Sequence, residues 1–317
     1  MPLSIQIASI SSPQPLRRFF LSVVLTGLLI PNFSAIATAF ERPSPSVIPL
    51  EQAASPIERR LIQGNDLLQA QKFVEALAVY EQLLKSVPNH ALALVGRGHA
   101  LYNLGRYPEA IATYRQAVAL APDLTAALVG IGNALDDSGQ SEAALDAYDH
   151  AIQISPKVAG AWFNRAVTLS KLHRSEAAIA AYNQTVQLDP RHETAWYNRG
   201  MELLDLKRLQ EALRSFEQVV HLNPGRTSAW LSRGNVLFDL KQFQEAVKSY
   251  DRVIALEPGN EEAWFNRGVA LTRIKRYQEA LSSFEQTLQI NPDNAKAQQN
   301  RQRLIRQINQ TTAQELV

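Results

Sequence analysis

The sequence contains no cysteine, and this absence removes several classes of function at once. The chain cannot form a disulfide, bind a metal through thiolates, use a cysteine nucleophile or carry a lipid on an N-terminal cysteine. Its six histidines form no i, i+4 pair, so the sequence predicts no metal site. Neither a G-x-S-x-G motif nor a P-loop is present. We therefore expect no enzymatic activity, no cofactor and no small-molecule substrate.

An excess of charge of either sign is also lacking. The chain has 32 Lys+Arg and 30 Asp+Glu. Two of the basic residues, Arg17 and Arg18, lie in an N-terminal segment that contains no acid, so the remainder balances 30 against 30. A near-neutral chain has no electrostatic footprint for nucleic acid or for an anionic membrane surface. We expect neither as a partner of the main part of the chain.

Proline is sparse, but its placement is regular. Seven of the 16 prolines stand 34 residues apart, at Pro88, Pro122, Pro156, Pro190, Pro224, Pro258 and Pro292. A fixed period of this length predicts stacked supersecondary units, because a unit that has one apolar face needs neighbours to bury it.

Aligned on this period, the chain divides into seven units that begin at Ile57, Ala91, Thr125, Ala159, Glu193, Thr227 and Glu261. Position 8 is always small, as Gly64, Gly98, Gly132, Ala166, Gly200, Gly234 and Gly268. Position 20 is always Ala, and position 24 is always aromatic, as Tyr80, Tyr114, Tyr148, Tyr182, Phe216, Tyr250 and Phe284. Together with the proline at position 32, this pattern resembles the tetratricopeptide repeat family over residues 57–294.

The resemblance implies an all-α fold, a right-handed α-solenoid of helix–turn–helix repeats. Small residues at positions 8 and 20 let two antiparallel helices approach closely, and the ring at position 24 fills the space that they leave. The seven units are 57–90, 91–124, 125–158, 159–192, 193–226, 227–260 and 261–294. Residues 295–310 are expected to form a capping helix, with Ala297, Asn300, Arg301 and Ile305 in first-helix phases, followed by a tail at 311–317.

The N-terminal segment has a different composition. After Arg17 and Arg18 comes an apolar run from Phe19 to Ile30, then Pro31 and the small residues of 34–39. This order is typical of a signal peptide over residues 1–39. The uncharged stretch reaches Phe40, so an uncleaved membrane anchor at residues 19–40 stays open, as does a cytoplasmic protein. The paired arginines also resemble a twin-arginine export signal. Residues 40–56 hold four prolines and predict an extended linker, and export would place the repeats in the periplasm or thylakoid lumen.

In the family, the first helices line a concave groove, mainly through positions 2, 5, 9, 12 and 13. At these positions the sequence offers an apolar, adaptable groove edged by acids, suited to a peptide or helix of a partner protein. The candidate residues are Tyr102, Asp136, Asp137, Phe163, Tyr197, Met201, Asp205, Phe238, Asp239 and Phe265. Some of these rings could instead pack between neighbouring helices. No unit has Lys at position 5, which disfavours the family's clamp for C-terminal carboxylates.

The function that this groove implies is that of a non-enzymatic adaptor or assembly scaffold. The repeats resemble those of bacterial, including cyanobacterial, proteins of this family. The identity of the partner cannot be read from the residues. The alternative is a structural protein of the cell envelope that associates with itself through its outer or end surfaces.

Charges at two repeat positions predict contacts between units. Position 7, usually Leu in this family, is Arg in five units, and position 25 is acidic in five. Pairing each position 25 with position 7 of the next unit gives Glu81–Arg97, Asp149–Arg165, Glu217–Arg233, Asp251–Arg267 and, at the cap, Glu285–Arg301. Asn183 would face Arg199 in the same way. We expect an ion-pair ladder between the second helix of one unit and the first helix of the next.

Overall fold

The computed structural model describes residues 55–315, with side chains described to residue 310. The expected signal peptide or anchor and nearly all of the expected linker lie outside the described residues. The described residues divide between two units, with the boundary between Arg59 and Arg60. Ser55 precedes helix α2 and caps it reciprocally: its hydroxyl accepts from the Glu58 amide at 3.2 Å, and the Glu58 carboxylate accepts from the Ser55 amide at 2.7 Å.

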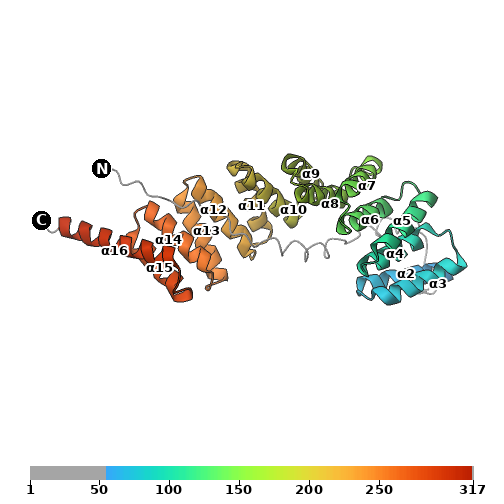
Figure 1. The fold of residues 1–317 in the computed structure, drawn as a ribbon, viewed down its shortest axis with the longest axis horizontal. Helices are drawn as coiled ribbons and strands as arrows, with labels where there is room; N and C mark the ends of the chain where they lie inside the picture. Colours follow the sequence, from blue (N-terminus) through green and yellow to red (C-terminus); the bar gives the residue numbers. More distant parts are fainter. Residues whose placement is uncertain (1–54, 316–317) are drawn as a thin grey trace, which may run out of the picture. The chain divides into compact units, whose positions relative to one another are not determined.

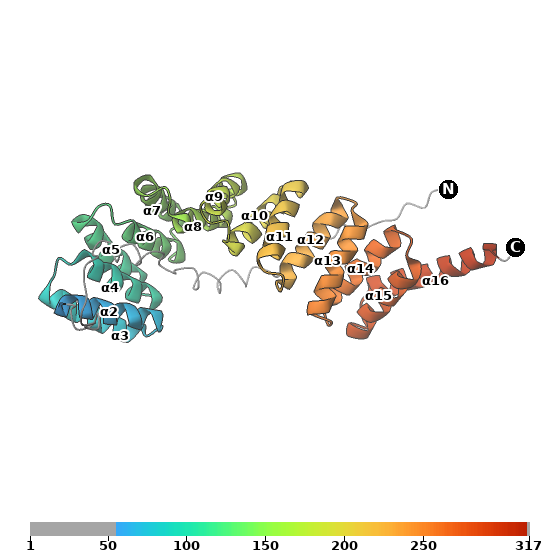
Figure 2. The same cartoon turned by 180° about the vertical axis from the view of Figure 1, so that it is seen from behind.

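Every described element is a helix, as expected (Figures 1 and 2). The first helices of the seven units are α2 (Pro56–Gln69), α4 (Ala91–Asn103), α6 (Thr125–Asp137), α8 (Ala159–Lys171), α10 (Glu193–Asp205), α12 (Thr227–Asp239) and α14 (Glu261–Arg273). The second helices are α3 (Phe73–Ser86), α5 (Tyr107–Leu120), α7 (Ser141–Ile154), α9 (Ser175–Leu188), α11 (Leu209–Leu222), α13 (Phe243–Leu256) and α15 (Tyr277–Ile290). Each second helix from α5 on packs against the first helix of its own unit, and each second helix packs against the first helix that follows it. Helix α3 contacts α2 through Tyr80, whose hydroxyl donates to Asn65 at 2.7 Å. The predicted all-α solenoid of helix–turn–helix repeats is therefore confirmed.

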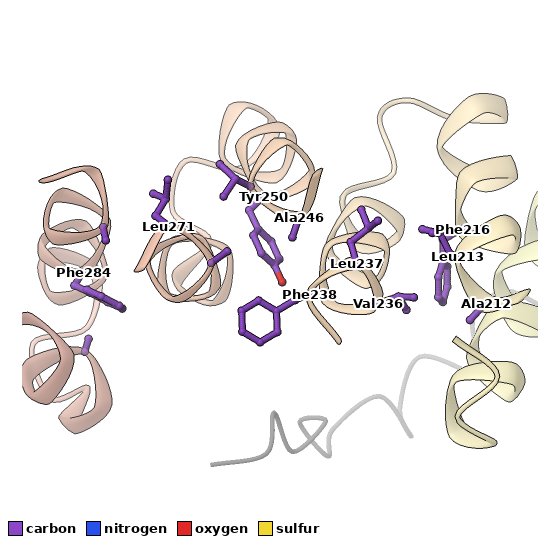
Figure 3. Packing of buried hydrophobic residues seen from close by; sticks show 14 of the residues in the cluster. Ala212, Leu213, Phe216, Val236, Leu237, Phe238, Ala246, Tyr250, Leu271 and Phe284 are labelled. Carbon is purple, nitrogen blue, oxygen red and sulfur yellow. The ribbon is translucent and has the colours of Figure 1, made fainter. Parts of the chain in front are cut away.

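The core repeats one contact from unit to unit. The ring at position 24 is buried in every unit, as Figure 3 shows for Phe216, Tyr250 and Phe284. A Cβ added at Gly64 would lie 2.6 Å from the Tyr80 ring, and one added at Gly200 would lie 2.8 Å from the Phe216 ring. Both separations are below any ordinary contact, so the small residue at position 8 is required by the ring. This explains why the repeat tolerates glycine inside a helix, where it costs about 1 kcal/mol.

The turn inside each unit requires a left-handed residue at position 15. Units 2 and 3 place glycine there, with φ of 72° at Gly105 and 85° at Gly139. The later units use larger residues, and Lys207, Lys241 and Lys275 have φ of 59° to 61°. A non-glycine residue in this region carries backbone strain of about 1 kcal/mol. Units 2 and 3 therefore make this turn at a lower cost than the other units, which include Gln71 in unit 1 and His173 in unit 4.

The ion-pair ladder between units is confirmed at all five predicted places. The separations are 3.6 Å for Arg97–Glu81, 2.6 Å for Arg165–Asp149, 3.3 Å for Arg233–Glu217, 2.6 Å for Arg267–Asp251 and 3.6 Å for Arg301–Glu285. Arg199 donates to Asn183 at 2.6 Å, as expected. Several of these arginines also donate to a hydroxyl in their own unit, for example Arg267 to Ser283 at 2.7 Å. The ladder thus ties each unit to its neighbour and to itself.

A second link between units was not predicted. The indole of Trp162 donates to the carbonyl of Pro156 at 2.9 Å, and Trp264 donates to Pro258 at 2.8 Å. The same bond recurs in the two units between them, and at the cap Gln298 takes the place of the tryptophan and donates to Pro292 at 2.7 Å. The periodic proline therefore contributes a carbonyl acceptor to the next unit as well as ending its own helix.

Helix α16 (Ala295–Glu315) follows the seventh unit, and it runs past residue 310, where the sequence placed its end. Ala297 is fully buried and Leu304 is 2% exposed, whereas Ile305, which the sequence places in the phase of position 11, is only partly buried. The difference follows from position in the stack. Position 11 packs toward the second helix of its own unit, which the cap lacks, while Leu304 at position 10 joins the core cluster behind it.

Candidate partner-binding face

The candidate residues lie on consecutive first helices, on a surface that we call the first-helix face. It comprises positions 5, 9, 12 and 13 of the first helices. We divide it into an N-terminal half on α4, α6 and α8 and a C-terminal half on α10, α12 and α14. The structure places Tyr102, Asp136, Asp137 and Phe163 in the N-terminal half and Tyr197, Met201, Asp205, Phe238, Asp239 and Phe265 in the C-terminal half.

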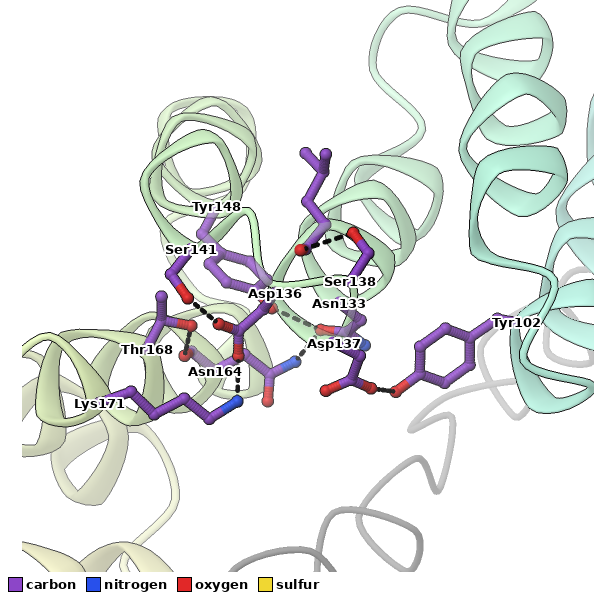
Figure 4. Close-up of polar contacts among 11 residues, drawn as sticks. Tyr102, Asn133, Asp136, Asp137, Ser138, Ser141, Tyr148, Asn164, Thr168 and Lys171 are labelled. Carbon is purple, nitrogen blue, oxygen red and sulfur yellow. Dashed lines mark hydrogen bonds and ion pairs between the residues drawn. The ribbon is translucent and has the colours of Figure 1, made fainter.

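The N-terminal half is crossed by polar contacts between units (Figure 4). The Tyr102 hydroxyl on α4 donates to Asp137 Oδ2 on α6 at 2.5 Å. Burial of the phenol and this hydrogen bond to a carboxylate raise the pKa of Tyr102 well above its usual value. The contact joins position 12 of one unit to position 13 of the next.

Asp136 is the best-satisfied carboxylate on the face. Its side chain is 7% exposed, and Oδ2 accepts an ion pair from Lys171 on α8 at 2.6 Å. The Ser141 hydroxyl on α7 donates to the other oxygen at 2.7 Å. The predicted residues Asp136 and Asp137 thus point to different neighbours, as adjacent residues of a helix do. Both carboxylates are therefore paired with groups of neighbouring units, Asp136 with Lys171 and Asp137 with Tyr102.

Amide side chains complete this network. The Tyr148 hydroxyl and the Asn164 amide both donate to Asn133 Oδ1, each at 2.8 Å. The same arrangement recurs three units later among Tyr250, Asn235 and Asn266, with distances of 2.9 and 3.0 Å. These hydrogen bonds between asparagine and tyrosine side chains were not predicted from the sequence. Their signal was present, because the asparagines recur at positions 9 and 6 beside a tyrosine at position 24.

Unit 2 lacks this arrangement. His99 occupies position 9 and Gly130 occupies position 6 of the next unit, so neither asparagine is present. Within the described residues, the buried hydroxyl of Tyr114 has no hydrogen-bond partner. The His99 ring lies edge-on to the Tyr114 ring, with centroids 5.5 Å apart. Burial lowers the pKa of His99 to about 4, so this imidazole is neutral at pH 7.

Two of the predicted rings are partly covered by the chain itself. Phe163 stacks on His192, with ring centroids 4.4 Å apart. Tyr197 carries the Arg226 guanidinium 4.0 Å from its centroid and lies edge-on to Phe216. Both residues at position 5 are only partly exposed. Phe163 and Tyr197 therefore pack against the residue that precedes the first helix of the following unit, and they also contribute to the face.

The other apolar candidates differ in exposure. Phe238 is 7% exposed and packs edge-on against Phe243 at 5.1 Å between ring centroids, so its ring belongs to the core (Figure 3). Met201 and Phe265 stay partly exposed on α10 and α14. The apolar part of the C-terminal half is consequently carried by Tyr197, Met201 and Phe265, without the Phe238 side chain as an exposed anchor.

The acids of the C-terminal half are in another state. Asp205 and Asp239 are exposed as residues, and neither makes a hydrogen bond or an ion pair within the described residues. Partial burial raises the pKa of both carboxyls, and repulsion from Glu202 raises that of Asp205 further. Lys207 acts on both from a distance and lowers both pKa values, by less than burial raises them. These carboxylates are partly desolvated without a partner.

Neither a membrane span nor a metal site is found among the described residues. Over residues 55–315, no helix is both long and apolar enough to span a bilayer. Nor does that part of the chain gather three or more His, Cys, Asp or Glu in a geometry that could hold a metal ion.

Comparison with known families places this architecture. A tetratricopeptide repeat model matches residues 62–125, 129–193, 163–227, 197–261 and 231–295. These segments cover more than half of the sequence, and the chain belongs to the tetratricopeptide repeat family. A search of curated proteins found no match.

Solved structures give the same fold. The C-terminal part of a repeat-containing protein from Cytophaga hutchinsonii matches 76% of this chain and 98% of its own, with a TM-score of 0.63 and 17% identity. YrrB, described as a repeat protein with an unusual peptide-binding site, matches 60% of this chain and 97% of its own, with a TM-score of 0.55 and 21% identity. The Pseudomonas aeruginosa protein pilF matches 66% of this chain and 95% of its own, with a TM-score of 0.51 and 19% identity.

Proposed function

We propose that this chain is a non-enzymatic adaptor that binds a peptide or a helix of a partner protein on its first-helix face. Proteins of this family generally mediate protein–protein interaction and scaffolding. The observation that carries the proposal is the partial exposure of Tyr197, Met201 and Phe265 on first helices that all contribute to one face. Partly exposed aromatic and Met side chains supply adaptable apolar contact for a segment of another chain. The peptide-binding site of YrrB, a structural neighbour, is consistent with this role.

We further propose that the chain acts after export, in the periplasm or thylakoid lumen of a bacterium. The support is the order of basic pair, apolar run and small residues within residues 1–39. Mass spectrometry of the protein from its native host would detect cleavage after Ala37 or Ala39. An intact N-terminus in a membrane fraction would favour the anchor at residues 19–40, and an intact soluble protein would contradict export.

The adaptor role is tested by comparing variants in a pull-down with the full tagged chain against envelope extract. The test variant is Tyr197→Ala with Met201→Ala. The control variant is Leu120→Ala with Leu256→Ala, which removes exposed aliphatic side chains, 43% and 39% exposed, at the ends of second helices. A partner captured by the parent and the control, and lost with the test variant at unchanged helicity, supports the proposal. Equal capture by all three would contradict it.

Self-association is the competing function, and light scattering separates the two. An adaptor should remain monomeric at micromolar concentration, because its exposed apolar side chains are reserved for a different partner. A mass that grows with concentration, and that the control variant but not the test variant reduces, would favour a self-associating structural protein.

A further inference from the structure

Position 13 holds an acid in both halves of the face, but among the described residues only the acid of the N-terminal half accepts a hydrogen bond from the preceding unit. In units 2 and 3, position 12 supplies the Tyr102 hydroxyl to Asp137 at position 13 of the following unit. Applied to the later units, the same register sets Ser170 before Asp205 and Leu204 before Asp239. Leu204 has no donor, and the Ser170 hydroxyl interacts with the Tyr182 hydroxyl at 3.4 Å. The C-terminal half therefore has acids at position 13, but position 12 of the preceding unit does not donate a hydrogen bond to them within the described residues.

The charge around these acids remains negative. Asp205 interacts with Glu202 and Lys207, and Asp239 interacts with Lys207. Lys207 is thus the cation that acts on both acids, and within the described residues it makes no ion pair with either. In the N-terminal half, by contrast, Lys171 lies 2.6 Å from Asp136. An uncompensated, partly desolvated carboxylate attracts a cation more strongly than one that is fully hydrated.

The apolar side chains of the same half bound this acidic patch. Met201 is one turn before Asp205 on α10, and Leu204 precedes Asp205 directly. Both are partly buried and pack on the core cluster, as do Tyr197, Leu231 and Phe265. A ligand that fits this surface must place apolar groups on the Met201 and Leu204 side chains and a donor at each carboxylate.

We propose that the C-terminal half of the first-helix face binds a basic, apolar segment of a partner, whose Lys or Arg side chains donate to Asp205 and Asp239 as Tyr102 donates to Asp137. The proposal rests on the adaptor role proposed above and specifies the chemistry of the partner. It is opposite in sign to recognition of acidic C-terminal tails. An anionic or neutral apolar segment would leave the two carboxylates desolvated and unpaired, and would bind less well.

The test uses the full chain and three labelled synthetic peptides of equal length, built from Leu with Lys, Leu with Gln or Leu with Glu. We expect the Leu/Lys peptide to bind about tenfold or more tightly than the Leu/Gln peptide in fluorescence anisotropy, and the Leu/Glu peptide to bind least. Added salt should reduce this preference, because ion pairs at a surface are screened. Equal binding of the Leu/Lys and Leu/Glu peptides, or no binding of the Leu/Lys peptide, would overturn the inference.

Variants locate the effect. Asp205→Asn with Asp239→Asn should remove the preference for Leu/Lys over Leu/Gln, while Asp123→Asn with Asp146→Asn, two exposed acids elsewhere, should leave it unchanged. A preference that survives Asp205→Asn with Asp239→Asn overturns the proposed site. The adaptor role fails separately: if Tyr197→Ala with Met201→Ala leaves natural partner capture intact, the face itself is wrong. If Tyr197→Ala with Met201→Ala abolishes partner capture but peptide charge has no effect on binding, the first-helix face is supported as the binding site and the proposed preference for a basic segment is wrong.

Discussion

The N-terminal and C-terminal halves of the first-helix face share one repeat scaffold and differ in how they treat polar side chains. On α4, α6 and α8, Asp136 and Asp137 are joined to Lys171 and Tyr102 by contacts between units. On α10 and α12, Asp205 and Asp239 occupy the same kind of position without such contacts. Carboxylates that are paired within the chain stabilise the solenoid. Partly desolvated carboxylates without a partner can still form hydrogen bonds or ion pairs with a ligand. We therefore assign a stabilising role to the polar side chains of the N-terminal half and partner binding to the C-terminal half.

The largest expected effects lie in the core, where the halves should behave alike. Tyr148→Ala in the N-terminal half and Phe216→Ala in the C-terminal half each remove a ring that is no more than 1% exposed. Each should cost about 3–5 kcal/mol of unfolding free energy, since each leaves a cavity between two units. Urea titration followed by circular dichroism measures this. A difference of several kcal/mol between the two variants would show that the scaffold itself differs between the halves.

Removing an internal partner should expose the contrast. Lys171→Met leaves the Asp136 carboxylate, 7% exposed, with only the Ser141 hydroxyl, and should cost about 1–3 kcal/mol. Asp205→Asn with Asp239→Asn should instead leave stability at pH 7 unchanged or slightly raised. The folded state raises the pKa of both acids, so their ionisation disfavours folding above those pKa values, and the amide removes that cost. A clear loss of thermal stability in the double variant would contradict this assignment.

His99→Asn sharpens the comparison inside the N-terminal half. Burial lowers the folded pKa of His99 to about 4, below the unfolded value of 6.5, so its contribution to stability is complete above pH 6.5 and is lost between pH 6.5 and 4. The asparagine should remove about 3 kcal/mol of this pH dependence. It should also give the Tyr114 hydroxyl the acceptor that Asn133 gives Tyr148. Thermal melts across this pH range test both effects, and a parent and variant with parallel pH profiles would contradict the first.

The smallest expected effect concerns the turns. Lys241→Gly should raise stability by about 1 kcal/mol, because a lysine at φ 61° carries strain that glycine avoids. The matched change Gly139→Lys, at a turn that already uses glycine, should lower stability by about the same amount. Chemical denaturation of both variants measures the difference, and changes of equal sign would show that neighbouring contacts outweigh backbone strain.

Much of this fold follows from sequence periodicity alone. Proline and small-residue spacing predicted the helix pairs, and complementary charge at positions 25 and 7 predicted every ion pair of the ladder. The face was harder to predict, because exposure depends on side-chain packing between units. Phe238 and Phe265 are both phenylalanines in the expected phases, yet Phe243 covers Phe238. Likewise, Asp137 and Asp239 both occupy position 13, and the residue at position 12 of the preceding unit, Tyr102 in one case and Leu204 in the other, separates them. The end of α16 was missed because its polar composition carries no stop signal.

Hydrogen exchange of the full chain with and without the Leu/Lys peptide tests the division of the face most directly. The account predicts slower amide exchange in α10, α12 and α14 when the peptide is bound, with little change in α4 and α6. The Leu/Glu peptide at the same concentration should leave exchange unchanged in all five helices. Protection concentrated in α4 and α6, or spread evenly along the first helices, would contradict the assignment of recognition to the C-terminal half.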